Sequence, residues 1–179
     1  MPKIIENVKD LLLIEARKTL LEQSYSELNI REISKRCGIG TGTFYNYFAN
    51  KEMLVSEIFR ADWKLVSNVI LNAETDTIEF KEKCRKIYIA LDVFIQQYSD
   101  IFFEMSTSGS QKKPCQETNK YDLIYSQMRL LISKEIDSKR IQTDLTSDQL
   151  SRLLISSFTF ASKHQYIDFD ALYSSFNLS

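Results

Sequence analysis

Backbone breakers are scarce in this sequence, and their scarcity is the strongest limit on its fold. The 179 residues include only four glycines and two prolines, and one of the prolines is Pro2. The long stretches between these breakers are rich in Leu, Ile, Lys, Glu and Ser, a composition that favours helix throughout. Because 44% of the residues are hydrophobic, the chain can also bury a real core. We therefore expect an all-α fold.

The stretch 29–54 carries the most information about function, and it reads NIREISKRCGIGTGTFYNYFANKEML. Ile33 and Cys37 recur at helical spacing, and Asn29 precedes them as a residue whose side chain can cap a helix. Gly38 falls where this helix must end, and glycine permits the positive φ that such an end needs. The pattern predicts a first short helix followed by a tight turn.

A second short helix is expected after the turn, with Thr41 or Thr43 as its N-cap. Phe44 and Phe48 lie four residues apart and so share one face of this helix. The remaining faces carry hydroxyl, amide and phenol groups, from Thr41, Thr43, Tyr45, Asn46 and Tyr47. Such groups can bond phosphate oxygens or base edges, and a threonine methyl can contact a thymine methyl. We interpret this face as a DNA-contacting surface.

Three further residues support that interpretation. Gly40 and Gly42 allow a close approach to the backbone, and Lys51 begins another helix just past Asn50. A cation beside free helix amides can hold a phosphate. The alternative is that the aromatic residues only fill a core, but a core does not explain the glycines, the paired threonines and the lysine in one run. The stretch therefore predicts a helix-turn-helix followed by a phosphate anchor.

The same run resembles the DNA-binding domain of the TetR family of bacterial transcriptional regulators, which ends in a Tyr-x-x-Phe-x-x-Lys-Glu pattern. The matching residues are Tyr45, Tyr47, Phe48, Lys51 and Glu52. The likeness extends over 14–54. The sequence departs from the family in three places: Ser24 replaces a common glycine, Ser34 a common alanine and Gly40 a common serine. The first two changes are between small residues, whereas Gly40 removes a side chain that could cap the helix or meet phosphate.

The resemblance implies roles for individual residues. Thr41, Gly42 and Tyr45 would face bases, while Thr43, Tyr47 and Lys51 would hold phosphates. Arg31 would read a guanine, although it could equally be an exposed helix charge. Together with Asn46 of the polar face, the expected DNA-binding residues are Arg31, Thr41, Gly42, Thr43, Tyr45, Asn46, Tyr47 and Lys51.

We expect two domains, a helix-turn-helix head over 1–54 and a helical effector-binding and dimerisation domain over 55–179. A helix over 3–23 would pack on the head, and a long helix over 51–72 would join the two parts. The other expected helices cover 78–98 with a break at 99–100, then 101–105, 119–140, 147–166 and 168–176. Loops are expected over 72–77 and 106–118. Residue 146 or 147 would cap the 147–166 helix.

The second domain is rich in aromatic residues, which line apolar ligand cavities but also fill ordinary helical cores. TetR relatives usually bind a small effector in this domain and dimerise through their two C-terminal helices. The residues expected to line such a site are Phe94, Tyr98, Phe102, Tyr125, Met128 and Phe158. For each of them core packing is the alternative, because this half of the family has no reliable motif.

Other function classes find little support in the sequence. The glycines at 38–42 follow a helical pattern, and their spacing fits neither a dinucleotide fingerprint nor a P-loop. With one histidine, three scattered cysteines and no Ser/His/Asp set, we expect no catalysis, no metal site and no cofactor. No apolar run is long enough to span a bilayer and no signal peptide is seen, so a cytoplasmic location is expected.

The resulting prediction is a ligand-responsive transcriptional regulator, in particular a repressor. It would bind a palindromic operator in double-stranded DNA as a homodimer, through the C-terminal helices, and a small-molecule effector would release it. The formal net charge of −1 means that DNA binding must come from local placement of charge. Two alternatives stay open, a constitutive helical DNA-binding protein without an effector and a small helical enzyme.

Overall fold

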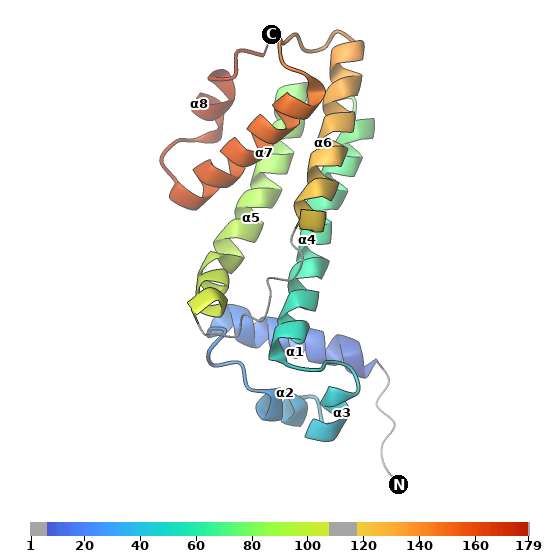
Figure 1. Ribbon diagram of the computed structural model, residues 1–179, viewed down its shortest axis with the longest axis vertical. Coiled ribbons are helices and arrows are strands. Elements are labelled where there is room, and N and C mark those ends of the chain that lie inside the picture. Colours follow the sequence, from blue (N-terminus) through green and yellow to red (C-terminus); the bar gives the residue numbers. More distant parts are fainter. Residues whose placement is uncertain (1–6, 108–117, 179) are drawn as a thin grey trace. The chain divides into compact units, whose positions relative to one another are not determined.

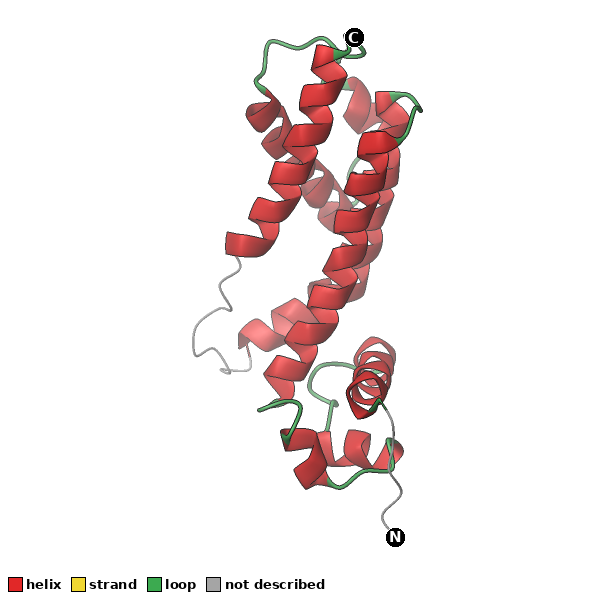
Figure 2. Ribbon diagram, turned by 90° about the vertical axis from the view of Figure 1, so that its right-hand side faces the viewer, coloured by secondary structure: helices red, strands yellow, loops and turns green. Residues whose placement is uncertain are grey.

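The computed structural model describes residues 7–107 and 118–178. Within these residues the chain forms eight α-helices and no strand (Figures 1 and 2). The helices are α1 (Val8–Glu22), α2 (Ile30–Arg36), α3 (Thr41–Tyr45), α4 (Lys51–Thr75), α5 (Phe80–Thr107), α6 (Thr118–Asp137), α7 (Ser147–His164) and α8 (Phe169–Ser174). The predicted all-α fold is confirmed.

The helices form two compact units. Of the described residues, 7–62 and 100–107 make up the first unit, and 63–99 and 118–178 make up the second. Helices α4 and α5 each contribute residues to both units. The expected functional boundary after residue 54 stays a prediction, because compactness does not decide which residues carry each function.

The first unit has a small core to which α1, α2, α3 and the start of α4 contribute. Leu12, Ala16 and Leu20 follow each other at four-residue intervals along α1 and are buried, so they form one apolar stripe. Phe44 and Phe48, also four residues apart, are buried with ring centroids 5.8 Å apart. Phe44, with Phe48 just after the helix, fixes α3 in the unit, while Tyr45 on α3 stays exposed to solvent.

Two predicted helix ends in the middle of the chain are wrong. Helix α4 continues to Thr75 instead of ending at residue 72, because the Asp76 backbone N–H and the Thr75 hydroxyl both bond the carbonyl of Asn72. Helix α5 shows no break at 99–100 and continues to Thr107. Tyr98 and Ile101 are both buried on either side of the expected break, so the packed face is continuous there.

The later helices agree better with expectation. Helix α6 starts at Thr118 and stops at Asp137, three residues before the predicted end. Thr146 is the N-cap of α7 and forms a capping box with Gln149, in which each side chain accepts a hydrogen bond from the other residue's backbone. Asp168 caps α8 in a similar way. Of the loop predicted over 106–118, residues 108–117 lie outside the described part of the chain, and the rest is helical.

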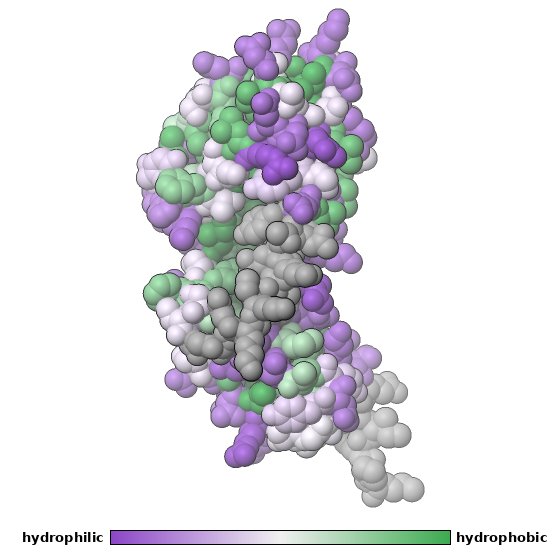
Figure 3. Space-filling view, viewed as in Figure 1, coloured by the Kyte–Doolittle hydropathy of each residue, from purple (hydrophilic) through white to green (hydrophobic). Residues whose placement is uncertain are grey.

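The surface of the second unit carries both apolar and polar side chains. Figure 3 shows apolar side chains exposed among polar ones on this unit. Among the described side chains from α6 to just beyond α7, the large exposed apolar residues are Leu123, Leu130, Leu145, Leu153, Phe160 and Tyr166. Across the described residues, no helix combines the length and the hydropathy that crossing a bilayer would need.

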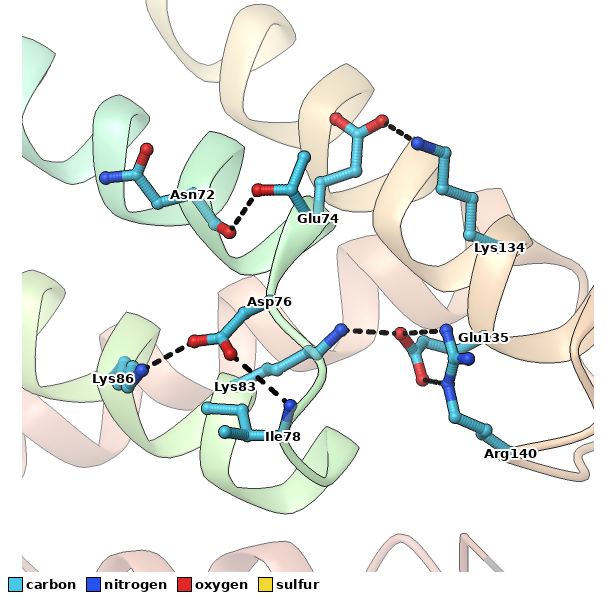
Figure 4. A network of polar contacts seen from close by, with 10 residues as sticks. Asn72, Glu74, Asp76, Ile78, Lys83, Lys86, Lys134, Glu135 and Arg140 are labelled. Carbon is cyan, nitrogen blue, oxygen red and sulfur yellow. Dashed lines mark hydrogen bonds and ion pairs between the residues drawn. The ribbon is translucent and has the colours of Figure 1, made fainter.

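An ion pair lies inside the second unit (Figure 4). Lys83 of α5 and Glu135 of α6 are both fully buried, with 2.9 Å between Nζ and Oε1. Arg140 donates to both carboxylate oxygens of Glu135, at 2.7 and 3.0 Å. Burial acts to raise the pKa of Glu135, but the hydrogen bonds from Arg140 and Lys83 outweigh it, so the pKa lies below its ordinary value. The buried charges are therefore satisfied within the unit.

Candidate nucleic-acid interface

The geometry of α2 and the following turn agrees with the sequence prediction. The Asn29 side chain accepts hydrogen bonds from the backbone N–H groups of Arg31 and Glu32, at 2.9 and 3.4 Å, so it caps α2. Gly38 adopts a φ of 69°, the left-handed conformation that favours glycine. The Ile39 backbone N–H then bonds the carbonyl of Ser34 at 3.0 Å and closes the turn. The predicted helix and turn are confirmed.

The predicted cap of α3 is wrong. Gly40 occupies the N-cap position with extended backbone, and no side chain caps the helix. Thr41 is instead the first helical residue, and Thr43 lies inside the helix. Both threonines are partly exposed. The cap was mispredicted because glycine is itself among the residues favoured at N-caps, even though it has no side chain to accept a hydrogen bond.

The rest of α3 and the residues after it present polar and aromatic groups to solvent. Tyr45 and Tyr47 keep 54% and 44% of their surface exposed, although they flank the buried Phe44 and Phe48. Asn46 is exposed as well. Gly42 is exposed, and a Cβ added there would meet no atom within 4 Å. The fold therefore does not require glycine at this position.

Lys51 is the first residue of α4, as predicted. The preceding Asn50 side chain accepts a hydrogen bond from the Met53 backbone N–H at 2.8 Å. The ammonium group of Lys51 lies 4.1 Å from the ring centroid of Tyr25, a cation–π contact. The Tyr25 hydroxyl donates to Glu52 at 3.0 Å. Tyr25 thus supports the base of the predicted phosphate anchor.

Sequence reasoning did not identify Tyr25 as part of this site. It precedes Lys51 by 26 residues in the connection between α1 and α2, so no local spacing links the two. Ser24 is next to it, at the position where the family has a glycine. The backbone of Ser24 does not adopt a positive φ, and its hydroxyl accepts a hydrogen bond from the Glu27 backbone N–H at 3.2 Å. The substitution therefore imposes no backbone strain.

Arg31 is exposed in the first turn of α2. Another basic residue of this helix, Arg36, is engaged within the unit instead, with Glu32 at 2.5 Å and with the Thr19 hydroxyl at 3.5 Å. Together, the start of α2, α3 with the two residues that follow it, and the start of α4 bring all eight predicted DNA-binding residues into the first unit. They supply hydroxyl, phenol, amide, guanidinium and ammonium groups, which can bond phosphate and base edges.

The six residues predicted to line an effector site do not form one group. Phe102 belongs to the first unit, where its ring centroid lies 4.4 Å from that of Phe59. Tyr98, Met128 and Phe158 are fully buried in the second unit, and Phe94 is nearly so. Tyr125 is partly exposed, with its hydroxyl 3.5 Å from that of Ser156. A role in ligand binding stays a prediction for each of them.

An open depression of about 500 Å³ on the second unit involves none of these six residues. It is lined by Tyr88, Asp92, Gln165, Tyr166, Ile167 and Asp168. Burial, with the nearby charges of Asp92 and Asp168, raises the pKa of Tyr88. Both carboxylates already serve the fold, because Asp92 accepts from the Ser162 hydroxyl at 2.6 Å and Asp168 caps α8. Among the described residues, no group of three or more potential ligands is placed to hold a metal ion.

Comparison with known proteins agrees with this geometry. Residues 12–58 match the family described as "Bacterial regulatory proteins, tetR family". YuxN of Bacillus subtilis (strain 168), an uncharacterized HTH-type transcriptional regulator, is 30% identical over 103 residues, which are 57% of this chain and 35% of YuxN. The match therefore spans about a third of that relative's length.

Solved structures share the fold over nearly the whole chain. GusR of Salmonella enterica superposes with a TM-score of 0.72 at 19% identity, covering 97% of this chain and 96% of GusR. FadR of Bacillus subtilis, solved in complex with stearoyl-CoA, superposes with a TM-score of 0.64 at 16% identity, covering 93% and 94%. The first unit thus defines a helix-turn-helix protein. Over residues 12–58 this chain is similar to the bacterial regulatory proteins of the tetR family.

Proposed function

We propose that the chain represses transcription by binding a near-palindromic operator as a homodimer and by releasing it when a small effector binds the second unit. The observation that carries the proposal is the exposed face of α3. Tyr45 and Tyr47 remain about half exposed although they stand next to buried phenylalanines, and Lys51 follows at the start of α4. The short helix α3 and the turn after it have no structural need for these exposed groups, whereas a major groove offers them partners.

Exposed apolar residues on α7 support dimerisation. Leu153 and Phe160 lie seven residues apart, so they share one face of the helix, and they keep 42% and 56% of their surface exposed. The exposed Ser156 lies between them on that face. Small and apolar side chains on one stripe let helices pack closely, as a two-fold interface requires. A dimer would present two recognition helices to successive major grooves.

The effector part of the proposal rests on the second unit. The second unit contains many aromatic residues, and the FadR that shares the fold was solved with stearoyl-CoA. Acyl-CoA compounds are therefore a reasonable first class to screen, alongside other apolar molecules. An effector would act by preferring a conformation whose two heads do not match the operator spacing, since a ligand shifts an equilibrium only by its differential affinity.

Selection of bound duplexes from a randomised DNA pool tests the main claim. We expect the purified, folded protein to enrich an inverted repeat whose half-sites lie about one helical turn apart. Failure to enrich any sequence would contradict specific DNA binding, and enrichment of a single unrepeated site would contradict the dimer. The Phe160→Glu variant adds a test of the interface, because it should sediment as a monomer while Glu22→Gln, a change on α1, should not.

A further inference from the structure

The last turns of α5 belong to the first unit, together with the predicted DNA-binding residues. Two contacts attach them there. Glu104 accepts a hydrogen bond from the Ser26 backbone N–H, with 3.0 Å between N and Oε2. The ring of Phe102 packs on Phe59 of α4, with centroids 4.4 Å apart. A residue far from the helix-turn-helix in sequence therefore holds the connection between α1 and α2.

That connection also supports the phosphate anchor. Ser26 directly follows Tyr25, whose ring lies under the Lys51 ammonium group at 4.1 Å. Tyr25 is 3% exposed, so its ring has little freedom to move away. By fixing the backbone at Ser26, Glu104 helps to hold the platform on which Lys51 rests.

Glu104 also acts on Lys51 through its charge. Partial burial lowers the pKa of Lys51, while the carboxylates of Glu52, Glu104 and Glu27 act in the opposite direction and stabilise the ammonium form. A DNA phosphate that approaches Lys51 meets the same carboxylates, and their negative charge opposes it. Of the three, only Glu104 comes from α5, whereas Glu27 and Glu52 lie in the head sequence itself.

We propose that Glu104 is a positioning residue that acts through Lys51 and keeps the affinity for DNA below the value the lysine would otherwise give. This inference rests on the proposed DNA-binding function and adds a residue that sets its strength. It also makes the end of α5 part of the DNA-binding head, because Glu104 bonds the α1–α2 connection and its negative charge acts on Lys51.

The Glu104→Gln variant separates the two effects of the side chain. Glutamine keeps an oxygen that can accept the Ser26 N–H but removes the negative charge. We expect this variant to bind the selected operator and unrelated duplexes about two- to five-fold more tightly, in the range typical of an exposed charge pair. Asp100→Asn is the matched control, because it makes the same charge change one turn earlier on α5 in the same unit. It should leave affinity nearly unchanged.

A double-mutant cycle with Lys51→Gln decides whether Glu104 acts through the lysine. The gain from Glu104→Gln should disappear in the Lys51→Gln background, measured by fluorescence anisotropy at about 0.05 M salt so that the weaker complex still forms. A gain that persists there, or an equal gain from Asp100→Asn, would overturn the inference in favour of a general charge effect. Weaker or unchanged binding by a folded Glu104→Gln protein would overturn it as well.

Failure of the inference is distinguishable from failure of the proposed function. If the unmodified protein selects an operator but Glu104→Gln binds it no better, the inference alone is wrong. If the unmodified protein binds no duplex while its circular dichroism and melting curve show a folded protein, DNA binding is wrong and the inference fails with it. Comparison of the melting curves of all variants excludes unfolding as the cause of any change.

Discussion

The aromatic residues on and just after α3 differ from those of the second unit in how far they are exposed to solvent. Tyr45 and Tyr47 project about half of their surface into solvent, and Gly42 has open space around its α-carbon. In the second unit, Tyr98 and Phe158 are fully buried, and the Phe158 ring packs edge-on against Tyr88 with centroids 5.7 Å apart. Tyr45 contacts the Phe44 ring, with centroids 5.4 Å apart, yet half of its surface stays open to an external ligand, whereas the buried aromatics of the second unit are enclosed by protein.

The charged groups of the two units also differ in whether they are paired inside the protein. Lys83 and Glu135 neutralise each other inside the second unit, and Arg140 completes the network. Lys51 is only partly buried, and its ammonium group rests on an aromatic ring. The second unit is thus held together by charges that are satisfied internally, while the head keeps a cation that a phosphate can reach. Mutations should separate the two regions, because one should lose stability and the other should lose binding.

The largest change in stability is expected from Glu135→Ala. It leaves Lys83 buried without its partner, which should lower the free energy of unfolding by about 3–5 kcal/mol. Urea denaturation measures this change. A loss below about 1 kcal/mol would show that the pair is not a structural element and would weaken the contrast between the units.

The same network predicts a pH dependence of stability. The pKa of Glu135 in the folded protein lies below its ordinary value of 4.5, so the unfolded chain binds the proton more readily. The stabilisation is therefore complete above that ordinary value and is lost as the pH falls through the folded pKa. Melting temperatures between about pH 3 and 6 should fall less steeply for Glu135→Gln than for the parent protein, with the slope as the measured quantity.

The next effect concerns the predicted effector residues. Phe158→Ala should cost about 3–5 kcal/mol if the ring is a core residue, whereas Phe102→Ala should cost clearly less because 39% of Phe102 is exposed. Denaturation curves of the two variants measure the difference. A small cost at Phe158, together with a lost thermal shift by a screened effector, would instead identify it as part of a ligand cavity.

The sequence predicted the features that depend on neighbouring residues, and it failed for those that depend on contacts between distant segments. Asn29, Gly38 and Lys51 were identified correctly because caps, turns and helix starts depend on a few neighbouring residues. The break expected at 99–100 was wrong because the burial of Tyr98 and Ile101, which carries the helix through, depends on tertiary packing. Tyr25 was missed for the same reason, since its contact with Lys51 joins segments 26 residues apart.

The predicted effector residues illustrate the limit most clearly. All six were chosen for their side-chain type, and type alone does not separate a pocket wall from a packed core. The structure assigns Phe102 to the first unit and buries Tyr98, Met128 and Phe158 completely in the second. Which aromatic residue faces a cavity depends on how several helices pack, and no local pattern in the sequence encodes that.

In the head, Tyr45→Ala and Lys51→Ala should each weaken operator binding by at least about tenfold while changing stability by less than about 0.5 kcal/mol. Both side chains reach solvent, so their loss leaves the core intact. Anisotropy titrations and urea denaturation give the two quantities. Operator affinity retained by either folded variant would count against the assigned docking surface.

Mutations of Lys51 and Thr41 should change different properties of DNA binding. Loss of a phosphate contact at Lys51 should weaken all sequences alike and reduce the slope of log affinity against log salt by about one. Thr41→Val should instead change which operator variants bind best, with little change in that slope. Salt titrations on a panel of operators separate the two properties, and equal effects of both variants would contradict the division.

The smallest change in stability is expected from Gly42→Ala, and it gives the most selective test of the exposed face. Alanine favours helix over glycine by up to about 1 kcal/mol, and the added methyl group would meet no atom within 4 Å. The variant should therefore be as stable as the parent protein or slightly more so. If DNA comes close to the backbone at this position, operator affinity should fall despite the gain in stability. An unchanged affinity would mean that the α3 backbone stays farther from the groove than proposed, and the exposed glycine would then have no role in binding.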